Sequence, residues 1–252
     1  MAVRAIRRAL RIFDPLLSRL ELRATGLDLR SSISHDQRLV LTVLAGALRD
    51  PGTVVYDIGA ASGEFSCAFA SVSTVDQVIA FEPLADSYDA LVTRTHDLAN
   101  VRTFRLALGD EPAVLGLNRS AWRNTSSFLA VNDLMRRNFP LAAQLEAVEN
   151  VEVARLDDVV RQHELPPPDV VKIDVQGFED RVIRGGRRTL RGARACVVET
   201  SLRPMYDGSP LFDDVYGCMR DLDFVLTGFA GSLGTSEGEL LQVDAVFEPQ
   251  AA

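Results

Sequence analysis

The sequence predicts an α/β fold in which a mostly parallel, seven-stranded sheet ends in an antiparallel hairpin. Seven short apolar runs alternate with stretches that are mostly long enough for crossover helices, a pattern typical of a parallel sheet covered on both faces. Only residues 231–239 separate the last two runs, which is too short for a crossover helix and favours a hairpin. The length of 252 residues fits one large domain.

The strands are expected, in order, at 53–58, 77–82, 101–106, 169–174, 195–200, 223–228 and 240–248, and the crossover helices at about 63–71, 86–98, 178–191 and 210–221. An earlier helix is expected from Ser34 to about Leu48, because Ser34 and Gln37 have the spacing of a capping box. Residues 107–168 form an insertion between two strands, which could add a small β element and a substrate lid. We therefore expect a helical extension at 1–33 and one domain at 34–252.

Composition limits the partners. The formal net charge of -8 and the pI near 5.0 disfavour nucleic-acid binding through a broad basic face, so a small molecule is the expected partner. The arginine-rich stretch at 1–33 has apolar residues at helical spacing, and is expected to pack on its own domain or to lie on an anionic membrane. It lacks the features of a secretory signal, so a cytoplasmic location is expected. The oligomeric state is not indicated.

The three cysteines, Cys67, Cys196 and Cys218, are far apart and lie in apolar stretches, so neither a disulfide framework nor a metal site is expected. Among 27 basic residues only one, Lys172, is a lysine. Where arginine serves as the general cation, a retained lysine indicates a place that needs a compact ammonium, or a surface position kept by chance.

A glycine turn follows the first strand, where Asp57 precedes Gly59 and Gly63. Such a turn lets backbone approach a ligand, although tight turns of this kind also occur elsewhere in α/β proteins. Glu82 ends the next strand, where an acid can accept both hydroxyls of a ribose. The spacing of the glycines lacks the G-x-G-x-x-G fingerprint of a pyrophosphate site, which disfavours an NAD-dependent oxidoreductase.

The chain resembles the FkbM-type methyltransferase family over roughly residues 34 to 248. The resemblance lies in VVYDIGAASGEF, VIAFEPLADSYDAL, FRLALGD, NTSSF, VARLDDVV, PDVVKIDVQGFEDRVIRGG, VVET and QVDAVF, in this order. It implies a class I methyltransferase (Rossmann-like) fold, S-adenosyl-L-methionine as cofactor, and methyl transfer to a hydroxyl on a sugar or natural product. The acceptor is then a small molecule or a glycan.

The resemblance and the glycine turn together predict the cofactor-binding residues Asp57, Gly59, Ala60, Ser62, Gly63, Glu82, Pro83, Ala107, Leu108 and Asp110. Two positions depart from the family, which commonly has asparagine at Ala61 and glutamate at Gln176. These departures motivate an alternative, a catalytically silent protein that binds S-adenosylmethionine or a partner through the same fold.

An alcohol must lose a proton when it is methylated, so a base is expected. The candidates are Asp174, Glu199 and His35, with Lys172 placed to hold Asp174 ionised or to orient an acceptor. Each has a structural alternative: Asp174 as a cap of the following turn, Glu199 as a partner of loop amides, and His35 as part of the first turn of a capped helix.

Two segments are candidates for the acceptor site. Trp122, Asn124 and Ser126 combine an aromatic face with amide and hydroxyl groups, which suits a sugar but is equally compatible with an ordinary surface turn. Arg203 and Tyr206 follow the carboxyl end of a strand, where open α/β sheets bind ligands.

Overall fold

The structure is a computed structural model that describes residues 25–29, 33–122 and 125–250. Its main sheet has seven strands in the order β3-β2-β1-β7-β8-β10-β9, and only β10 runs in the direction opposite to the other strands. The strands are β1 (Thr53–Ile58), β2 (Val75–Phe81), β3 (Val101–Phe104), β7 (Val170–Ile173), β8 (Ala195–Ser201), β9 (Phe224–Gly234) and β10 (Leu240–Pro249). The predicted fold class, including the final hairpin, is confirmed.

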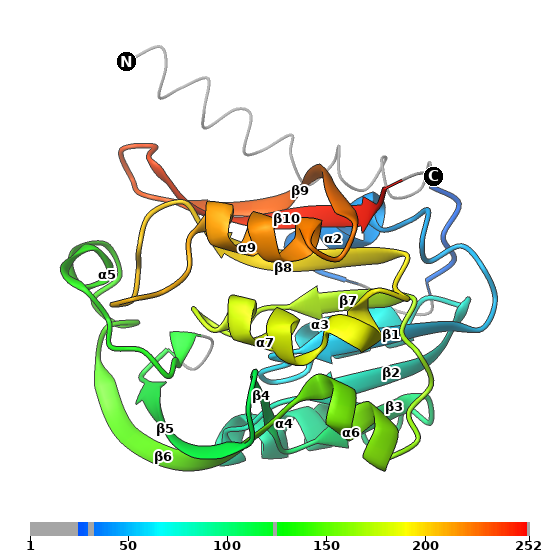
Figure 1. The fold of residues 1–252 in the computed structure, drawn as a ribbon, viewed down its shortest axis with the longest axis horizontal. Coiled ribbons are helices and arrows are strands. Elements are labelled where there is room, and N and C mark those ends of the chain that lie inside the picture. Colours follow the sequence, from blue (N-terminus) through cyan, green and yellow to red (C-terminus); the bar gives the residue numbers. More distant parts are fainter. Residues whose placement is uncertain (1–24, 30–32, 123–124, 251–252) are drawn as a thin grey trace.

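Helices cover both faces of this sheet (Figure 1). On one face the buried residues of α6 (Leu156–Gln162), α7 (Glu179–Gly185), α8 (Arg187–Leu190) and α9 (Phe212–Arg220) share a core cluster with alternate strand residues such as Tyr56 and Ile58. On the other face α2 (His35–Val43) and α3 (Glu64–Ala70) pack around Val55. Helix α4 (Ala85–Thr95) packs through Leu91 against Ala80 of β2. All six residues of β1 are buried, as expected for a central strand.

The segment between β3 and β7 builds a second, three-stranded sheet of β4 (Ala107–Leu108), β5 (Ala113–Ser120) and β6 (Leu145–Ala154), in the order β4-β6-β5. A short helix, α5 (Asp133–Asn138), lies between β5 and β6 in sequence. Figure 1 shows β5, β6 and α5 on the side of the molecule toward which β7 and β8 point. The insertion therefore stands beside the carboxyl ends of the parallel strands, where open α/β sheets bind ligands.

Two predicted helices are shorter than expected. The capping box between Ser34 and Gln37 begins α2 as predicted, but α2 ends at Val43 and only turns follow to Leu48. Leu48 is nonetheless fully buried, because these turns still pack on the core. The helix expected at 178–191 is split into α7 and α8 at Gly186, where a Cβ would lie 2.8 Å from the Leu156 side chain.

Most of the predicted helical extension at 1–33, and with it the proposed membrane contact, lies outside the described residues. Within the described ranges, none of the helices has the length and apolar character needed to cross a bilayer.

Candidate functional site

The site lies where the strand order reverses, between β1 and β7. Asp57, near the end of β1, is fully buried, and Ser66 of α3 donates a hydrogen bond to its Oδ2 at 2.6 Å. Its Oδ1 has no hydrogen-bond partner among the described residues. Burial raises the pKa of Asp57, while Lys172 partly offsets that effect. A buried carboxylate oxygen without a donor fits a ligand that brings one, such as an amino group.

Glycine is needed at the two positions of the turn for different structural reasons. Gly59 has φ of 83°, and a Cβ there would lie 1.8 Å from the carbonyl oxygen of Asp174, so the turn passes directly against the end of β7. Gly63 has φ of 82°, and a Cβ would lie 2.7 Å from Leu91 on α4. Gly59 thus lets β1 and β7 converge at the site, whereas Gly63 serves the packing of two helices.

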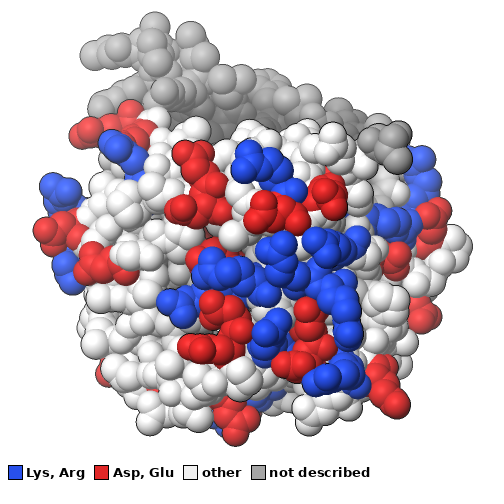
Figure 2. Space-filling view, in the orientation of Figure 1, with Lys and Arg blue, Asp and Glu red and all other residues white. Residues whose placement is uncertain are grey.

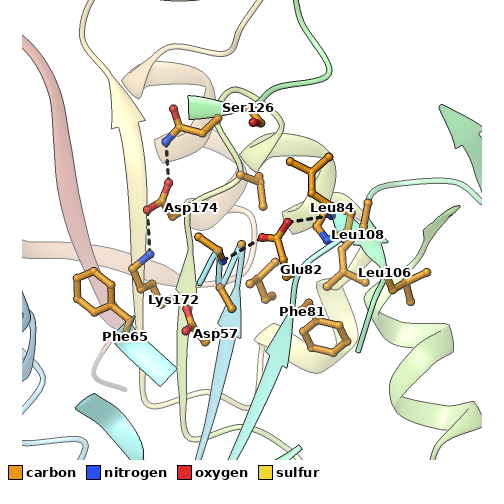
Figure 3. Close-up of a pocket in the computed structure, with 18 of the residues that line it drawn as sticks. Asp57, Phe65, Phe81, Glu82, Leu84, Leu106, Leu108, Ser126, Lys172 and Asp174 are labelled. Carbon is orange, nitrogen blue, oxygen red and sulfur yellow. Dashed lines mark hydrogen bonds and ion pairs between the residues drawn. The ribbon is translucent and has the colours of Figure 1, made fainter. Parts of the chain in front are cut away.

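Glu82 follows β2 and is held by two backbone amides (Figure 3). The amide of Ala61 donates to its Oε2 at 2.9 Å and that of Leu84 to its Oε1 at 2.9 Å. Burial raises the pKa of Glu82 to about 7. Each carboxylate oxygen keeps a lone pair for a further donor, so a fixed pair of acceptors is available to two neighbouring hydroxyls.

Asp57, Gly59 and Glu82 line a first cavity. This cavity lies between the ends of β1 and β2 on one side and the insertion on the other. Eight of the ten predicted cofactor residues line it: Asp57, Gly59, Ala60, Ser62, Glu82, Pro83, Ala107 and Leu108. Ser126, predicted for the acceptor, also lines this cavity. Sequence reasoning missed its apolar walls, Phe65, Phe81, Leu106, Leu117 and Phe128, because an apolar residue carries no signal that separates a ligand wall from the core.

Two predicted cofactor residues do not line the first cavity. Asp110 instead pairs with α7, its carboxylate lying 3.7 Å from Arg181 and 3.4 Å from Arg184. Two arginines of the neighbouring helix thus hold this carboxylate outside the described cavity lining, and its role in cofactor binding stays a prediction. Gly63 is the second predicted cofactor residue outside the lining. It is the N-cap of α3 and stands between the lining residues Ser62 and Glu64.

A second cavity adjoins the first. Phe65, Lys172, Asp174 and Gln176 line both cavities and so form the wall between them. The remaining polar and aromatic lining of the second cavity includes Asp36, Trp122, Thr125, Glu199, Ser232, Gln242 and Asp244. Asp36, Gln242 and Asp244 were missed by the sequence analysis, because Asp36 and Asp244 come from opposite ends of the chain and only the fold brings them together.

The shared wall is a continuous polar network (Figure 3). Lys172 Nζ donates to Asp174 Oδ2 at 2.9 Å and lies 4.6 Å from the centre of the Phe65 ring. Gln176 Nε2 donates to Asp174 Oδ1 at 2.8 Å and to Glu199 Oε2 at 2.7 Å. Burial alone would lower the pKa of Lys172, but Asp174 and other nearby carboxylates raise it above its ordinary value. The lysine therefore stays charged and orients Asp174.

Glu199 differs from Asp174 in its surroundings. Its Oε2 accepts hydrogen bonds from Gln176 and, at 3.0 Å, from Gln242. Burial, and then the nearby carboxylates led by Asp174, raise the pKa of Glu199 well above its ordinary value. Glu199 therefore holds its proton to a higher pH than an ordinary carboxyl group does.

The other predicted site residues lie elsewhere. Tyr206 is buried and donates to Gln176 Oε1 at 2.8 Å, so it supports the shared wall rather than lining the second cavity. Arg203 is exposed and pairs with Glu239 at 2.7 Å, and neither Arg203 nor His35 lines either cavity. Asn124 lies outside the described residues.

Two buried acids at the ends of adjacent strands and a glycine turn between them line the first cavity, and a second cavity adjoins it. Together with the comparisons that follow, this fold identifies a methyltransferase that depends on S-adenosyl-L-methionine. The chain belongs to the FkbM methyltransferase family, since the model of the methyltransferase FkbM domain matches residues 57–226.

Two curated relatives are similar over most of their length. The hexuronic acid methyltransferase AglP of Haloferax volcanii is 26% identical over 204 residues, covering 76% of each chain. The 2-O-methyltransferase NoeI of Sinorhizobium fredii is 26% identical over 170 residues, covering 66% of this chain and 70% of the relative. Among solved structures, the precorrin-6y C5,15-methyltransferase of Geobacter metallireducens aligns with a TM-score of 0.48 and 14% identity, over 85% of this chain and 89% of that one.

Proposed function

We propose that this enzyme methylates a hydroxyl group of a sugar. The observation that carries the proposal is the shared wall: Lys172, Asp174 and Gln176 face both the first cavity and the second. A methyl donor in the first cavity and an acceptor in the second would therefore meet at Asp174. Such contact is required, because an acceptor oxygen must approach the methyl carbon in line with the bond that breaks.

In this proposal the first cavity holds the cofactor. The unpartnered oxygen of Asp57 accepts from its amino group, and Glu82 accepts from its ribose hydroxyls. The bound sulfonium supplies a methyl group that is already activated. The chain itself has to orient the acceptor, exclude water and take up the proton that the hydroxyl releases.

We assign the role of base to Asp174. It lines both cavities, and Lys172 and Gln176 each donate one hydrogen bond to it, which leaves a lone pair on each oxygen. Of the other two candidates, Glu199 lines only the second cavity and His35 lines neither. Asp174 is therefore the carboxylate placed to accept the hydroxyl proton as the oxygen bonds to carbon.

Two observations support a sugar as the acceptor. The second cavity combines the Trp122 side chain, which is 53% exposed, with the amide and carboxylate groups of Gln242 and Asp244. An aromatic face beside hydrogen-bonding groups suits a pyranose ring, which has apolar faces and a polar edge. Both curated relatives carry names of methyltransferases, and one acts on hexuronic acid by its name.

The test is methyl transfer from labelled S-adenosyl-L-methionine to a panel of monosaccharides and oligosaccharides, with the product located by mass spectrometry. We expect a mono-O-methylated sugar, formed by the native enzyme and not by Asp174→Asn. Transfer to a nucleic acid or a protein, with no transfer to any sugar, would contradict the proposal. Cofactor binding, measured by calorimetry, shows in each case that the protein is folded.

A further inference from the structure

The charges that line the second cavity are mostly negative. Three carboxylates, Asp36, Asp174 and Asp244, face it together with Glu199, and Lys172 is the single basic residue of its described lining. The three aspartates alone outnumber the one ammonium of the described lining. A cavity lined by one sign of charge concentrates ligands of the opposite sign.

Lys172, the only basic group of the described lining, already forms an ion pair. Lys172 donates to Asp174 at 2.9 Å, and its side chain is only 4% exposed. Among the described residues that line the cavity there is no arginine, although arginine is the side chain best shaped to bind a carboxylate or phosphate. Basic residues are instead plentiful on the outer face covered by α7 and α9, interspersed with acids (Figure 2). An anionic acceptor would thus find no free cation among the described residues that line the second cavity.

Asp244 is a carboxylate of this lining that would gain from a cationic ligand. It lies on β10 opposite Glu199, and Gly231 on β9 makes room for it, since a Cβ there would lie 2.6 Å from Asp244 Oδ2. Within the described part of the chain no hydrogen bond to its side chain is formed. Burial raises the pKa of Asp244 to about 6, an effect that Lys172 reduces and that Asp174 and Asp36 reinforce. A donor that carries positive charge would relieve both the desolvation and the repulsion.

We infer that the acceptor carries a protonated amine, as an amino sugar does, and that Asp244 and Asp36 bind this amine while the hydroxyl to be methylated faces Asp174. The inference rests on the proposed function, because it takes the second cavity as the acceptor site. It separates this enzyme from any relative whose acceptor carries a carboxylate, since the described cavity walls offer such a group no unpaired cation.

The chain provides its own probe of acceptor binding. Trp122 is the only tryptophan of the sequence and lines the second cavity. Its fluorescence can be titrated in the presence of S-adenosylhomocysteine with three matched pyranosides: the methyl glycosides of glucosamine, N-acetylglucosamine and glucuronic acid. These carry a cation, no charge and an anion, respectively. We expect the amine to bind at least about tenfold more tightly than the neutral sugar, as a charge-assisted hydrogen bond provides, and the acid to bind least.

The variant Asp244→Asn keeps the shape of the side chain and removes its charge. We expect it to lower the preference for the amine over the neutral sugar by about tenfold while cofactor affinity stays unchanged. The matched control is Asp97→Asn, whose side chain is 85% exposed and lines neither cavity. The control should keep the native preference.

The outcomes separate this inference from the proposed function. Equal or tighter binding of the neutral or acidic sugar, or a preference for the amine that survives in Asp244→Asn, would overturn the inference even if sugars are methylated. Preferential binding of the amine that depends on Asp244 supports it. If that preference is found but no sugar is methylated, the proposed sugar function fails while the charge selectivity of the cavity stands.

Discussion

Lys172 donates a hydrogen bond to Asp174 at 2.9 Å, across the end of the central strand β7. The lysine side chain is 4% exposed and that of the aspartate 27%, so the cation lies inside and the carboxylate reaches the cavities. This pair is the point at which the two cavities meet, and the proposed chemistry depends on it.

Replacing Asp174 with asparagine should remove the acceptor of the hydroxyl proton and preserve cofactor binding. We expect Asp174→Asn to lower kcat by at least about 100-fold, the usual loss when a general base is removed. Calorimetry should give a cofactor affinity close to that of the native enzyme. Asp76→Asn, on the exposed side of β2, is the matched control. Full turnover by Asp174→Asn would remove Asp174 from the role of base.

Lys172→Met tests the electrostatic role of the single lysine. The substitution leaves Asp174, Asp57 and Asp244 without their common countercharge, and we expect the free energy of unfolding at neutral pH to fall by about 3 kcal/mol. This deficit should shrink as the pH is lowered toward about 5, because protonation of the carboxylates removes the uncompensated charge. Urea unfolding of the native protein and the variant, at neutral pH and at about pH 5, measures this deficit. A deficit that does not change with pH would point to lost packing alone.

Glu82 should contribute a pH dependence to stability. Its pKa is raised from 4.5 to about 7, so between these values the folded protein holds a proton that the unfolded chain releases. The stability from this group is present below 4.5 and is lost as the pH rises through about 7, an effect of about 3 kcal/mol. We expect Glu82→Gln to flatten the decline in the free energy of unfolding with pH.

The control for Glu82 is Glu237→Gln, in the exposed loop of the final hairpin. It should leave the pH profile as in the native protein. Chemical unfolding in steps of pH without cofactor provides the comparison. The same slope in Glu82→Gln and in the native protein would show that the Glu82 carboxyl is not responsible.

Gly59→Ala tests the close approach of the turn to β7. A Cβ would lie 1.8 Å from the carbonyl oxygen of Asp174, and the residue has a left-handed φ of 83°. We expect a loss of at least about 3 kcal/mol in the free energy of unfolding, since backbone must move as well as adopt strain. Gly208→Ala shares the left-handed conformation, with φ of 77°, but has nothing within 4 Å.

The Gly208→Ala variant should lose only about 1 kcal/mol, the cost of the backbone conformation by itself. Thermal unfolding of the two variants side by side separates the steric contribution from the conformational one. Equal losses would mean that the turn at Gly59 relaxes without disturbing Asp174.

Most of the fold could be predicted because its determinants are local. Apolar runs, a capping box and a short interval before the last strand suffice to predict the order of elements and the final hairpin. The lengths of the helices were less predictable: the helix expected at 178–191 divides at Gly186, where Leu156 of α6 leaves no room for a Cβ. Asp110 shows the same limit at the site, because α7 supplies the arginines that hold it.

By itself the sequence determined the glycine turn, the two buried acids Asp57 and Glu82 and the unusual single lysine, because each stands at or beside the end of a recognisable strand. The tertiary structure alone decided which side chains share a cavity. Asp36 and Asp244 meet Asp174 only because β10 inserts between β8 and β9 and α2 packs on the same face. The charge of the second cavity is thus set by contacts between distant segments, which local patterns do not encode.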